Sequence, residues 1–534
     1  MSTTENRASA KSPLEQEVAQ GYNLLSQGRM DEAVELGDRL AAAHADNTHV
    51  LVFAAEASLA KGDPTAALGR ITQAITASHG NPFLKIKKAR LLSQMRRRAE
   101  VPALAAEVSA QAGGNGHLLW QLGNLYYRSN LQAEAIAHFK KAHALLGDHP
   151  GLLYDMAIAQ FFSGDFEQAE RDLDKMPRNS PYAGNALYLR ATLRRQTPEH
   201  NHVEDIERRL KAGLANAETE AAALYALAKE LEDLGEHERS FSNLVAAASK
   251  KRGTLQYDLA PELDALQAIC DTYTTEVMTA PTVGHDEEGA IFIVGMPRTG
   301  TTLVERLLVQ SGKVMSAGEL MDFGSQVGMA TNKVLKGEPA LSPAEASLKI
   351  DFASLGREYM WGARQAAAGS TMFIDKMPVN FTYCGLIRKA LPKAKIIHLV
   401  RDPLDSCYAV FKTLFFKAYS FSFDMDELAD YYIAYHRMMR HWHEVMSGQI
   451  LDVHYEDLVT DTENQAKRIF DWCGLEWNPT VLETPDEKTV FATASAAQVR
   501  EPVHSRSIHS SRRYREQLAP LAAKLVAAGI AFDR

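Results

Sequence analysis

The spacing of hydrophobic residues divides the chain into two parts. From about residue 14 to 250, apolar positions, mostly alanine and leucine, recur with the periodicity of amphipathic helices. Farther along, short β-rich runs alternate with helical segments, which predicts an α/β domain with a parallel sheet. The expected strands cover residues 291–294, 372–374, 395–400 and 450–455.

The helical part also repeats itself, with a period of 34 residues. One phase of the period holds a residue that tolerates a left-handed backbone, and an alanine follows five residues later. A tight turn followed by a close crossing of two helices requires this combination. The pairs are Gly28 and Ala33, Gly62 and Ala67, Asn130 and Ala135, and Gly164 and Ala169.

This period predicts six or seven helical hairpins stacked into a solenoid, with a short insertion near residues 197–202. Such an array presents a concave groove that usually receives a peptide or protein segment. A scaffold or a homodimer surface is an equally good interpretation, because a fold alone does not reveal what it binds.

A stretch rich in proline, glycine and charge, residues 280–289, ends the helical pattern and marks an expected domain boundary. The predicted fold class is an α-solenoid followed by a P-loop-type α/β domain with a parallel sheet. The expected parts are a disordered N-terminus (1–13), the repeat solenoid (14–250), a helical connector and linker (251–288) and the α/β domain (289–534).

Composition excludes several classes of protein. The net charge of −9 argues against a general affinity for nucleic acid or for an anionic membrane. No apolar run is long enough to cross a bilayer, and the first dozen residues lack the apolar core of a secretory signal, so we expect a cytoplasmic protein. The scattered cysteines indicate neither a zinc site nor a disulfide framework. They are Cys270, Cys384, Cys407 and Cys473.

The most informative segment joins the first expected strand to the helix after it. Gly295 and Gly300 have the spacing of a Walker A loop, in which backbone N–H groups and a helix N-terminus hold phosphate. The next position is Thr301, where a nucleotide triphosphatase has lysine. Without that lysine the loop is poorly suited to β/γ-phosphates, whereas Arg298 and the hydroxyls of Thr301 and Thr302 suit a smaller, less charged group. We infer a 5′-phosphosulfate.

This loop resembles the 5′-phosphosulfate loop of sulfotransferases that use 3′-phosphoadenosine 5′-phosphosulfate. The likeness is closest to tyrosylprotein sulfotransferases and to bacterial tetratricopeptide-repeat sulfotransferases, and the 34-residue period resembles tetratricopeptide repeats. The resemblance implies this donor, 3′,5′-adenosine bisphosphate as its product, and no metal. The loop residues implied to bind the donor are Pro297, Arg298, Thr299, Gly300, Thr301 and Thr302.

Two residues farther on match catalytic positions of tyrosylprotein sulfotransferases. Glu319 matches the glutamate that takes the proton of the acceptor hydroxyl. Lys376 resembles the lysine that contacts the transferring group and the bridging oxygen. A fixed cation there stabilises the charge that gathers on the leaving phosphate. With Arg298 and Ser495, these are the expected catalytic residues.

Arg401 ends the third expected strand, with Asp402 as the expected N-cap of the next helix and Pro403 as its first residue. The segment resembles the 3′-phosphate motif of sulfotransferases, in which the arginine pairs with the ribose 3′-phosphate. The serine that the family has eight residues later is Ala409 here. Ser406, one turn earlier on the same helix face, is the expected substitute.

The remaining expected donor contacts follow the last strand. Tyr455 resembles the family tyrosine near the adenosine. Ser495 lies in a segment similar to the loop that closes over the donor, and it matches a serine that contacts the phosphosulfate. The basic residue expected beyond that loop is Ser510 here, and Arg512 is the expected substitute.

A pair of nearby histidines is a weak candidate for a metal site. His441 and His443 are two residues apart on an expected helix, and such residues do not face each other. They are therefore interpreted as ordinary surface or core residues.

These features favour a sulfotransferase that modifies an acceptor hydroxyl on a peptide, a protein or a small compound, with tyrosyl peptides suggested by the likeness. Two alternatives stay open. One is a P-loop kinase-like phosphotransferase. The other is a repeat-based adaptor whose catalytic domain is degenerate. The departures from the family pattern at Ala409 and Ser510 are compatible with this alternative.

Overall fold

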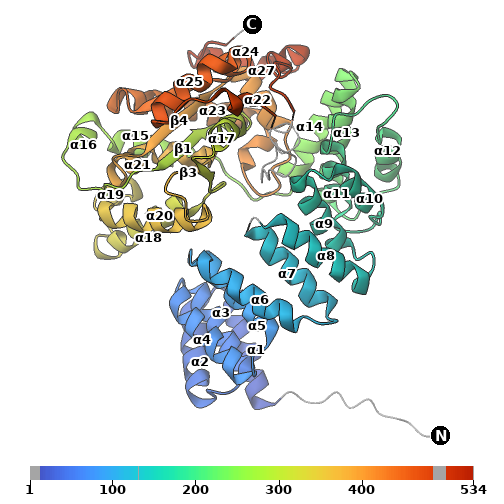
Figure 1. Cartoon of the computed structure of the whole chain (residues 1–534), viewed down its shortest axis with the longest axis vertical. Helices are drawn as coiled ribbons and strands as arrows, with labels where there is room; N and C mark the ends of the chain where they lie inside the picture. The colour runs from blue at the N-terminus through green and yellow to red at the C-terminus, as the bar shows by residue number, and fades with distance from the viewer. Residues whose placement is uncertain (1–11, 130, 485–500, 533–534) are drawn as a thin grey trace. The chain divides into compact units, whose positions relative to one another are not determined.

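The computed structural model describes residues 12–129, 131–484 and 501–532 (Figure 1). Its internal contacts group the chain into two compact units, residues 1–147 and 148–534. Among the described residues, no helix has both the length and the apolar character needed to cross a membrane.

The first unit consists of helical hairpins. Gly28 and Gly62 turn between paired helices with φ of 75° and 86°, and Ala33 and Ala67 are buried at the helix crossings, so the predicted turn-and-crossing pattern is confirmed there. Asn130 lies outside the described residues, while its partner Ala135 is fully buried. The helices are α1 (Pro13–Ser26), α2 (Met30–Ala43), α3 (Thr48–Ala60), α4 (Pro64–Ala77), α5 (Pro82–Gln94), α6 (Val101–Gln111), α7 (Gly116–Arg128) and α8 (Gln132–Leu146).

The second unit begins with further hairpins of the same kind. Gly164 turns with φ of 83° and Ala169 is fully buried at the crossing that follows. The helices are α9 (Pro150–Ser163), α10 (Phe166–Asp174), α11 (Ala183–Thr192), α12 (Val203–Lys211), α13 (Ala217–Asp233) and α14 (His237–Arg252), followed by α15 (Ala260–Thr272) and α16 (Thr275–Thr279). Together with the first unit, the described residues form seven hairpins, as the period predicts.

A parallel sheet of five strands forms the centre of the α/β domain, in the order β2-β3-β1-β4-β5. The four expected strands are confirmed. The strands are β1 (Ala290–Gly295), β2 (Met315–Ser316), β3 (Phe373–Asp375), β4 (Lys395–Val400) and β5 (Ile450–His454).

Helices cover both faces of this sheet (Figure 1). Alternate residues of β1 point to opposite faces, as in any strand. Phe292 joins the core beneath α18 and α20, and Ile293 joins the core beneath α17 and α25. The helices are α17 (Thr301–Val309), α18 (Asp322–Gly337), α19 (Pro343–Ser347), α20 (Phe352–Ala366), α21 (Cys384–Ala390), α22 (Pro403–Phe411), α23 (Met425–Val445), α24 (Tyr455–Thr460), α25 (Thr462–Cys473) and α27 (Ala519–Ala527).

The last repeats share their core with the α/β domain. Tyr225 of α13 and Phe241 of α14 belong to the same buried cluster as Phe411 of α22, and Phe241 lies 5.2 Å from Tyr514, between ring centroids. Polar contacts accompany this packing. Glu232 accepts a hydrogen bond from the Tyr408 hydroxyl at 2.8 Å and pairs with Lys412 at 3.1 Å. The boundary between the compact units therefore lies at Gly147, well before the change of sequence pattern at residues 280–289.

Candidate active site

The loops that follow the strands surround a cavity of about 900 Å³. Because the strands are parallel, their carboxyl ends meet at one edge of the sheet, where ligands bind in α/β folds. Sequence-predicted residues from five different loops line this one cavity. They are Pro297, Arg298, Gly300, Thr301, Thr302, Glu319, Lys376, Arg401 and Tyr455.

Close packing shapes the loop between β1 and α17. A Cβ atom on Gly295 would lie 2.8 Å from the Leu399 carbonyl oxygen, and one on Gly300 would lie 2.6 Å from the Tyr455 ring, so both positions require glycine. Thr299 is buried and donates a hydrogen bond to the Met296 carbonyl at 2.7 Å, which closes the turn.

The same loop ends at a helix N-terminus. Gly300 is the N-cap of α17, and as a glycine it has no side chain of its own with which to cap the helix. The first N–H groups of a helix lack intrahelical partners and carry the positive end of its dipole. Thr301 and Thr302 are buried in this first turn and line the cavity. This arrangement suits an anion.

Two arginines add positive charge to the cavity. Arg298 has φ of 67°, an uncommon value for a residue with a side chain, and burial together with the nearby charge of Arg401 lowers its pKa. Arg401 donates hydrogen bonds to the carbonyls of Arg298 at 3.0 Å and Ser507 at 2.7 Å, and its guanidinium lies 4.9 Å from the centre of the Tyr455 ring. A half-buried and a buried cation that repel each other favour an anionic ligand between them.

One nitrogen of the Arg401 guanidinium makes no hydrogen bond within the part of the chain that the structure describes. The Nε of Arg401 is buried and has no hydrogen-bond partner among the described residues. Leaving a buried charged donor unsatisfied costs free energy, so its position indicates a ligand that accepts from it. The N-cap that precedes α22 is as predicted, because Asp402 accepts from the backbone N–H groups of Leu404 and Asp405.

Lys376 and Glu319 are in direct contact at the ends of β3 and β2. Lys376 is almost fully buried, and its Nζ pairs with Glu319 and lies 4.0 Å from Glu305 Oε2. Burial alone would lower the pKa of Lys376, but the charges of Glu305 and Glu319 outweigh burial and raise it. Lys376 therefore remains a cation. Glu319 is half-exposed on the cavity side, where an acceptor can reach it.

The buried carboxyl group of Asp375 helps to position this pair. Asp375 accepts hydrogen bonds from the Tyr359 hydroxyl at 2.7 Å, from Asn380 at 3.2 Å and from the backbone N–H of Leu320 at 3.3 Å. The last bond fixes the residue next to Glu319. Burial raises the pKa of Asp375 to about 7, although the three hydrogen bonds oppose the rise.

The substitutes expected from the sequence take different positions. Ala409 and Ser510, the two departures from the family pattern, both line the cavity. Ser406 lies one turn from Ala409, buried, and its Oγ has no partner among the described residues, but it is not part of the cavity wall. Arg512 is exposed and also lies off the wall. Ser495 lies outside the described residues.

The structure adds residues that sequence reasoning missed. Glu305, on α17, supplies a second carboxylate toward Lys376. Phe162, from repeat helix α9, lines the cavity beside an apolar wall. Tyr188, from α11, accepts a hydrogen bond from the backbone N–H of Leu414 at 3.1 Å. No local pattern marks these residues. The apolar wall consists of Met321, Met377, Val379, Tyr383, Phe415 and Tyr419.

Comparison with known proteins agrees with this geometry. Residues 290–479 match the sequence profile of the Sulfotransferase family, and residues 133–193 match that of the Tetratricopeptide repeat. A protein of Aquifex aeolicus (strain VF5) described as uncharacterized is 27% identical over 401 residues, or 73% of this chain and 52% of the relative. Protein-tyrosine sulfotransferase of Drosophila melanogaster is 24% identical over 245 residues, or 42% of this chain and 46% of the relative.

Among solved structures, that of Pseudomonas aeruginosa PilF covers 43% of this chain and 96% of its own, with 15% identity and a TM-score of 0.31. The chain spans about half the length of the curated relatives named above. The parallel sheet and the loop between β1 and α17 both lie within the residues that match the Sulfotransferase family. The α/β domain is therefore similar to the Sulfotransferase family over residues 290–479, and part of the repeat array, residues 133–193, is similar to the Tetratricopeptide repeat.

Proposed function

We propose that the chain is a sulfotransferase that moves a sulfuryl group from 3′-phosphoadenosine 5′-phosphosulfate to an acceptor hydroxyl. The observation that carries the proposal is the convergence of Arg298, Lys376 and Arg401 with the Glu319 carboxylate on a single cavity. Three fixed cations and a helix N-terminus fit a nucleotide with two anionic groups, and the carboxylate fits a hydroxyl that must lose its proton.

The residues present fit the two charged ends of this donor. The tight loop from Gly295 to Gly300 and the start of α17 after a glycine N-cap suit the phosphosulfate. Arg401, whose buried Nε has no hydrogen-bond partner in the described parts of the chain, suits the 3′-phosphate. Bound there, the donor supplies an activated sulfuryl group.

Each side chain near the reacting centre then has a defined task. Lys376 places a permanent positive charge where negative charge develops on the leaving oxygen, which lowers the barrier. Glu319, held by Lys376 and open to the cavity, accepts the proton of the acceptor. Glu305 shares the charge of Lys376, so that Glu319 can leave the ion pair without isolating the lysine.

The acceptor is proposed to be a phenolic hydroxyl, as on tyrosine. Tyr383, Phe415 and Tyr419 line the cavity together with Phe162 of the repeats, and aromatic walls bind flat aromatic groups by burial and ring packing. The contribution of α9 to this wall suggests that the repeats help to select the acceptor.

The test is sulfuryl transfer by the purified full chain from radiolabelled donor to a small phenol and to a tyrosyl peptide. We expect transfer to both, and Lys376→Met should lower turnover by about 10²- to 10³-fold. Lys389→Met is the control, because Lys389 is also a buried lysine but binds Thr282 away from the cavity. Phosphoryl transfer from ATP with Mg²⁺, in place of sulfuryl transfer, would overturn the proposal in favour of a kinase-like enzyme.

A further inference from the structure

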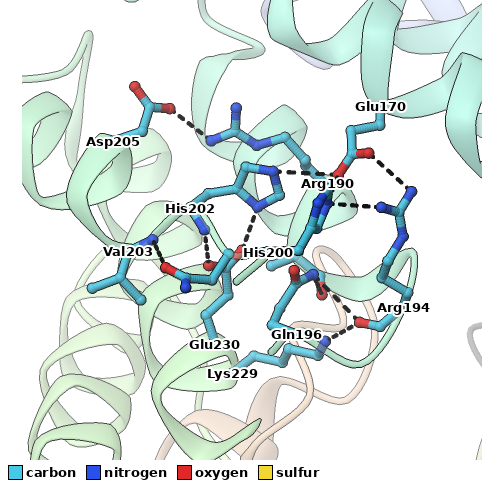
Figure 2. Close-up of polar contacts among 12 residues, drawn as sticks. Glu170, Arg190, Arg194, Gln196, His200, His202, Val203, Asp205, Lys229 and Glu230 are labelled. Carbon is cyan, nitrogen blue, oxygen red and sulfur yellow. Dashed lines mark hydrogen bonds and ion pairs between the residues drawn. The ribbon is translucent and has the colours of Figure 1, made fainter. Parts of the chain in front are cut away.

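The insertion between α11 and α12 brings two histidines to a carboxylate on a neighbouring repeat (Figure 2). Most hairpins turn through a few residues, such as 27–29 between α1 and α2, whereas α11 and α12 are joined by residues 193–202. This longer connection carries His200 and His202. Their ring nitrogens and a carboxylate oxygen of Glu170, on α10, all lie within 4.8 Å of one another.

The connection is firmly held. Backbone hydrogen bonds of 3.0 and 3.1 Å join Thr197 and His200 in both directions, which closes a tight turn. Farther back, the backbone N–H of Gln196 donates to Asp233 on α13 at 2.8 Å. The two imidazoles are therefore placed by the backbone and do not depend on each other for their position.

Glu230 determines which nitrogen of His202 faces the cluster. This glutamate, on α13, is fully buried and accepts hydrogen bonds from His202 Nδ1, at 2.8 Å, and from the His202 backbone N–H. A carboxylate can only accept, so Nδ1 carries the hydrogen and Nε2 of the neutral ring carries a lone pair. A carboxylate that orients a histidine in this way is the usual outer partner of a metal ligand.

Arg194 determines which nitrogen of the second imidazole, that of His200, carries a lone pair. One nitrogen of its guanidinium lies 2.7 Å from His200 Nε2, and another lies 2.9 Å from Glu170 Oε2. A guanidinium can only donate, so His200 Nε2 also carries a lone pair. Neither imidazole Nε2 therefore carries a hydrogen of its own toward Glu170 Oε1, and the hydrogen that His200 Nε2 accepts comes from Arg194.

The distances between these acceptors match a metal site. His200 Nε2 and His202 Nε2 lie 3.2 and 3.3 Å from Glu170 Oε1. Ligand atoms bound tetrahedrally to Zn²⁺ at its usual bond lengths are separated by about 3.3 Å. We propose that Glu170, His200 and His202 bind one Zn²⁺, with water as fourth ligand, Glu230 as the outer partner, and Arg194 moved off His200 toward solvent.

Such an ion would tie the inserted connection to two neighbouring helices, α10 and α13. These helices belong to the repeats that precede α14 in the second unit. The ion would thus stabilise the part of the array that shares its core with the α/β domain. Arg194 is partly exposed, so its guanidinium can withdraw while keeping its bond to Glu170 Oε2.

A second cluster serves as the internal control. His398, His443 and Asp452 also lie close together, but both ring nitrogens of His398 are already engaged, by Asp452 at 2.8 Å and by the Tyr435 hydroxyl at 2.5 Å. His443 donates to the same Asp452 at 3.0 Å. This cluster is a closed hydrogen-bond network, and His441 faces elsewhere, toward the Tyr273 carbonyl.

The test is calorimetric titration of the metal-stripped full chain with Zn²⁺, with circular dichroism as a check of folding. We expect one site per chain. His200→Ala, a change at a half-exposed position, should weaken binding at least tenfold, and Glu230→Gln should weaken it by about 10- to 100-fold with every ligand still present. His443→Ala should leave the affinity unchanged.

Three results would overturn the proposal. The first is the lack of any stoichiometric Zn²⁺ site. The second is equal affinity of the wild type and a folded His200→Ala variant. The third is a site lost in His443→Ala instead, which would place the ion in the other cluster. In the first two cases the three residues would form a charged network in which an imidazolium supplies the missing hydrogen.

Discussion

The two halves of the repeat array share one period but not one structural role. In the first unit, residues such as Val50 and Phe53 pack within the repeats themselves. In the second unit, Tyr225 and Phe241 pack in the same core as the sheet, and Phe162 reaches the cavity wall. A repeat motif therefore predicts the local hairpin, while the side chains on its outer faces decide whether the hairpin packs only within the repeats or also against the α/β domain.

Removal of the second half should have the largest effect. A chain that begins at Gly289 loses α13 and α14, which exposes the apolar core around Phe411 and leaves Lys412 without Glu232. We expect it to be insoluble or without a cooperative melting transition. A chain that begins at Asp148 keeps these contacts and should melt cooperatively. Cooperative melting of the shorter chain at the same temperature would contradict the shared core.

Glu319→Gln should separate chemistry from folding. It removes the proposed base but leaves the shape of the loop, so turnover with a weakly acidic phenol should fall by about 10²- to 10⁴-fold. The melting temperature and the binding of 3′,5′-adenosine bisphosphate should change little. A nitrophenol, which loses its proton readily, should be less affected. Equal losses on both phenols would exclude Glu319 as the base.

Matched truncations of buried aromatic residues compare the two cores directly. Phe53→Ala in α3 and Tyr225→Ala in α13 each remove a fully buried ring, and each should cost its own unit about 3–5 kcal/mol of folding free energy. Only Tyr225→Ala should lower the temperature at which binding of 3′,5′-adenosine bisphosphate is lost. Thermal titration with that ligand measures the effect of each substitution on binding. An equal effect of Phe53→Ala would contradict the conclusion that only the second unit shares its core with the α/β domain.

The smallest effect concerns acid stability. Burial alone would raise the pKa of Glu232, but the Lys412 charge and the Tyr408 hydrogen bond outweigh it and hold the pKa below its ordinary value of 4.5. The resulting stabilisation is complete above that value and is lost as the pH falls through the lower, folded-state pKa. Glu232→Gln should remove about 1–2 kcal/mol at neutral pH and flatten the stability curve on the acid side.

The control for this pH effect comes from the first unit. Glu32 pairs with Arg29 at 2.6 Å, but both side chains are exposed to solvent. Glu32→Gln should therefore leave the melting temperature unchanged from pH 3.5 to 7. If the curves of the wild type and Glu232→Gln run parallel over that range, the ion pair between α13 and α22 does not contribute as described.

The sheet and the glycine-bounded loop after its first strand could be predicted because their signals are local. Four apolar runs and the spacing of Gly295 and Gly300 suffice to locate them. The short strand β2, with two residues, is too brief to form a pattern. From the sequence alone, Glu305 is indistinguishable from a solvent-exposed charge on a helix. Only the packing of α17 in the folded domain brings it toward Lys376.

The contribution of the repeats could not be predicted for a related reason. Phe162 and Tyr225 have the spacing of core residues in any helical hairpin, so nothing in the sequence shows that they pack beyond their own repeat. Likewise, the sequence indicates the insertion near residues 197–202. It does not indicate that the histidines of the insertion approach Glu170, because this approach depends on how α10 and α13 flank the insertion.

The most direct test of the account is donor-dependent sulfuryl transfer to a small phenol by a chain that begins at Asp148, compared with the full chain. If the catalytic body consists of residues 148–534, both chains should transfer the group at rates within about threefold, since the cavity and the core beneath it are intact. Loss of transfer on removal of residues 1–147, with folding preserved, would contradict that claim. Absence of transfer by both chains would contradict the assigned chemistry.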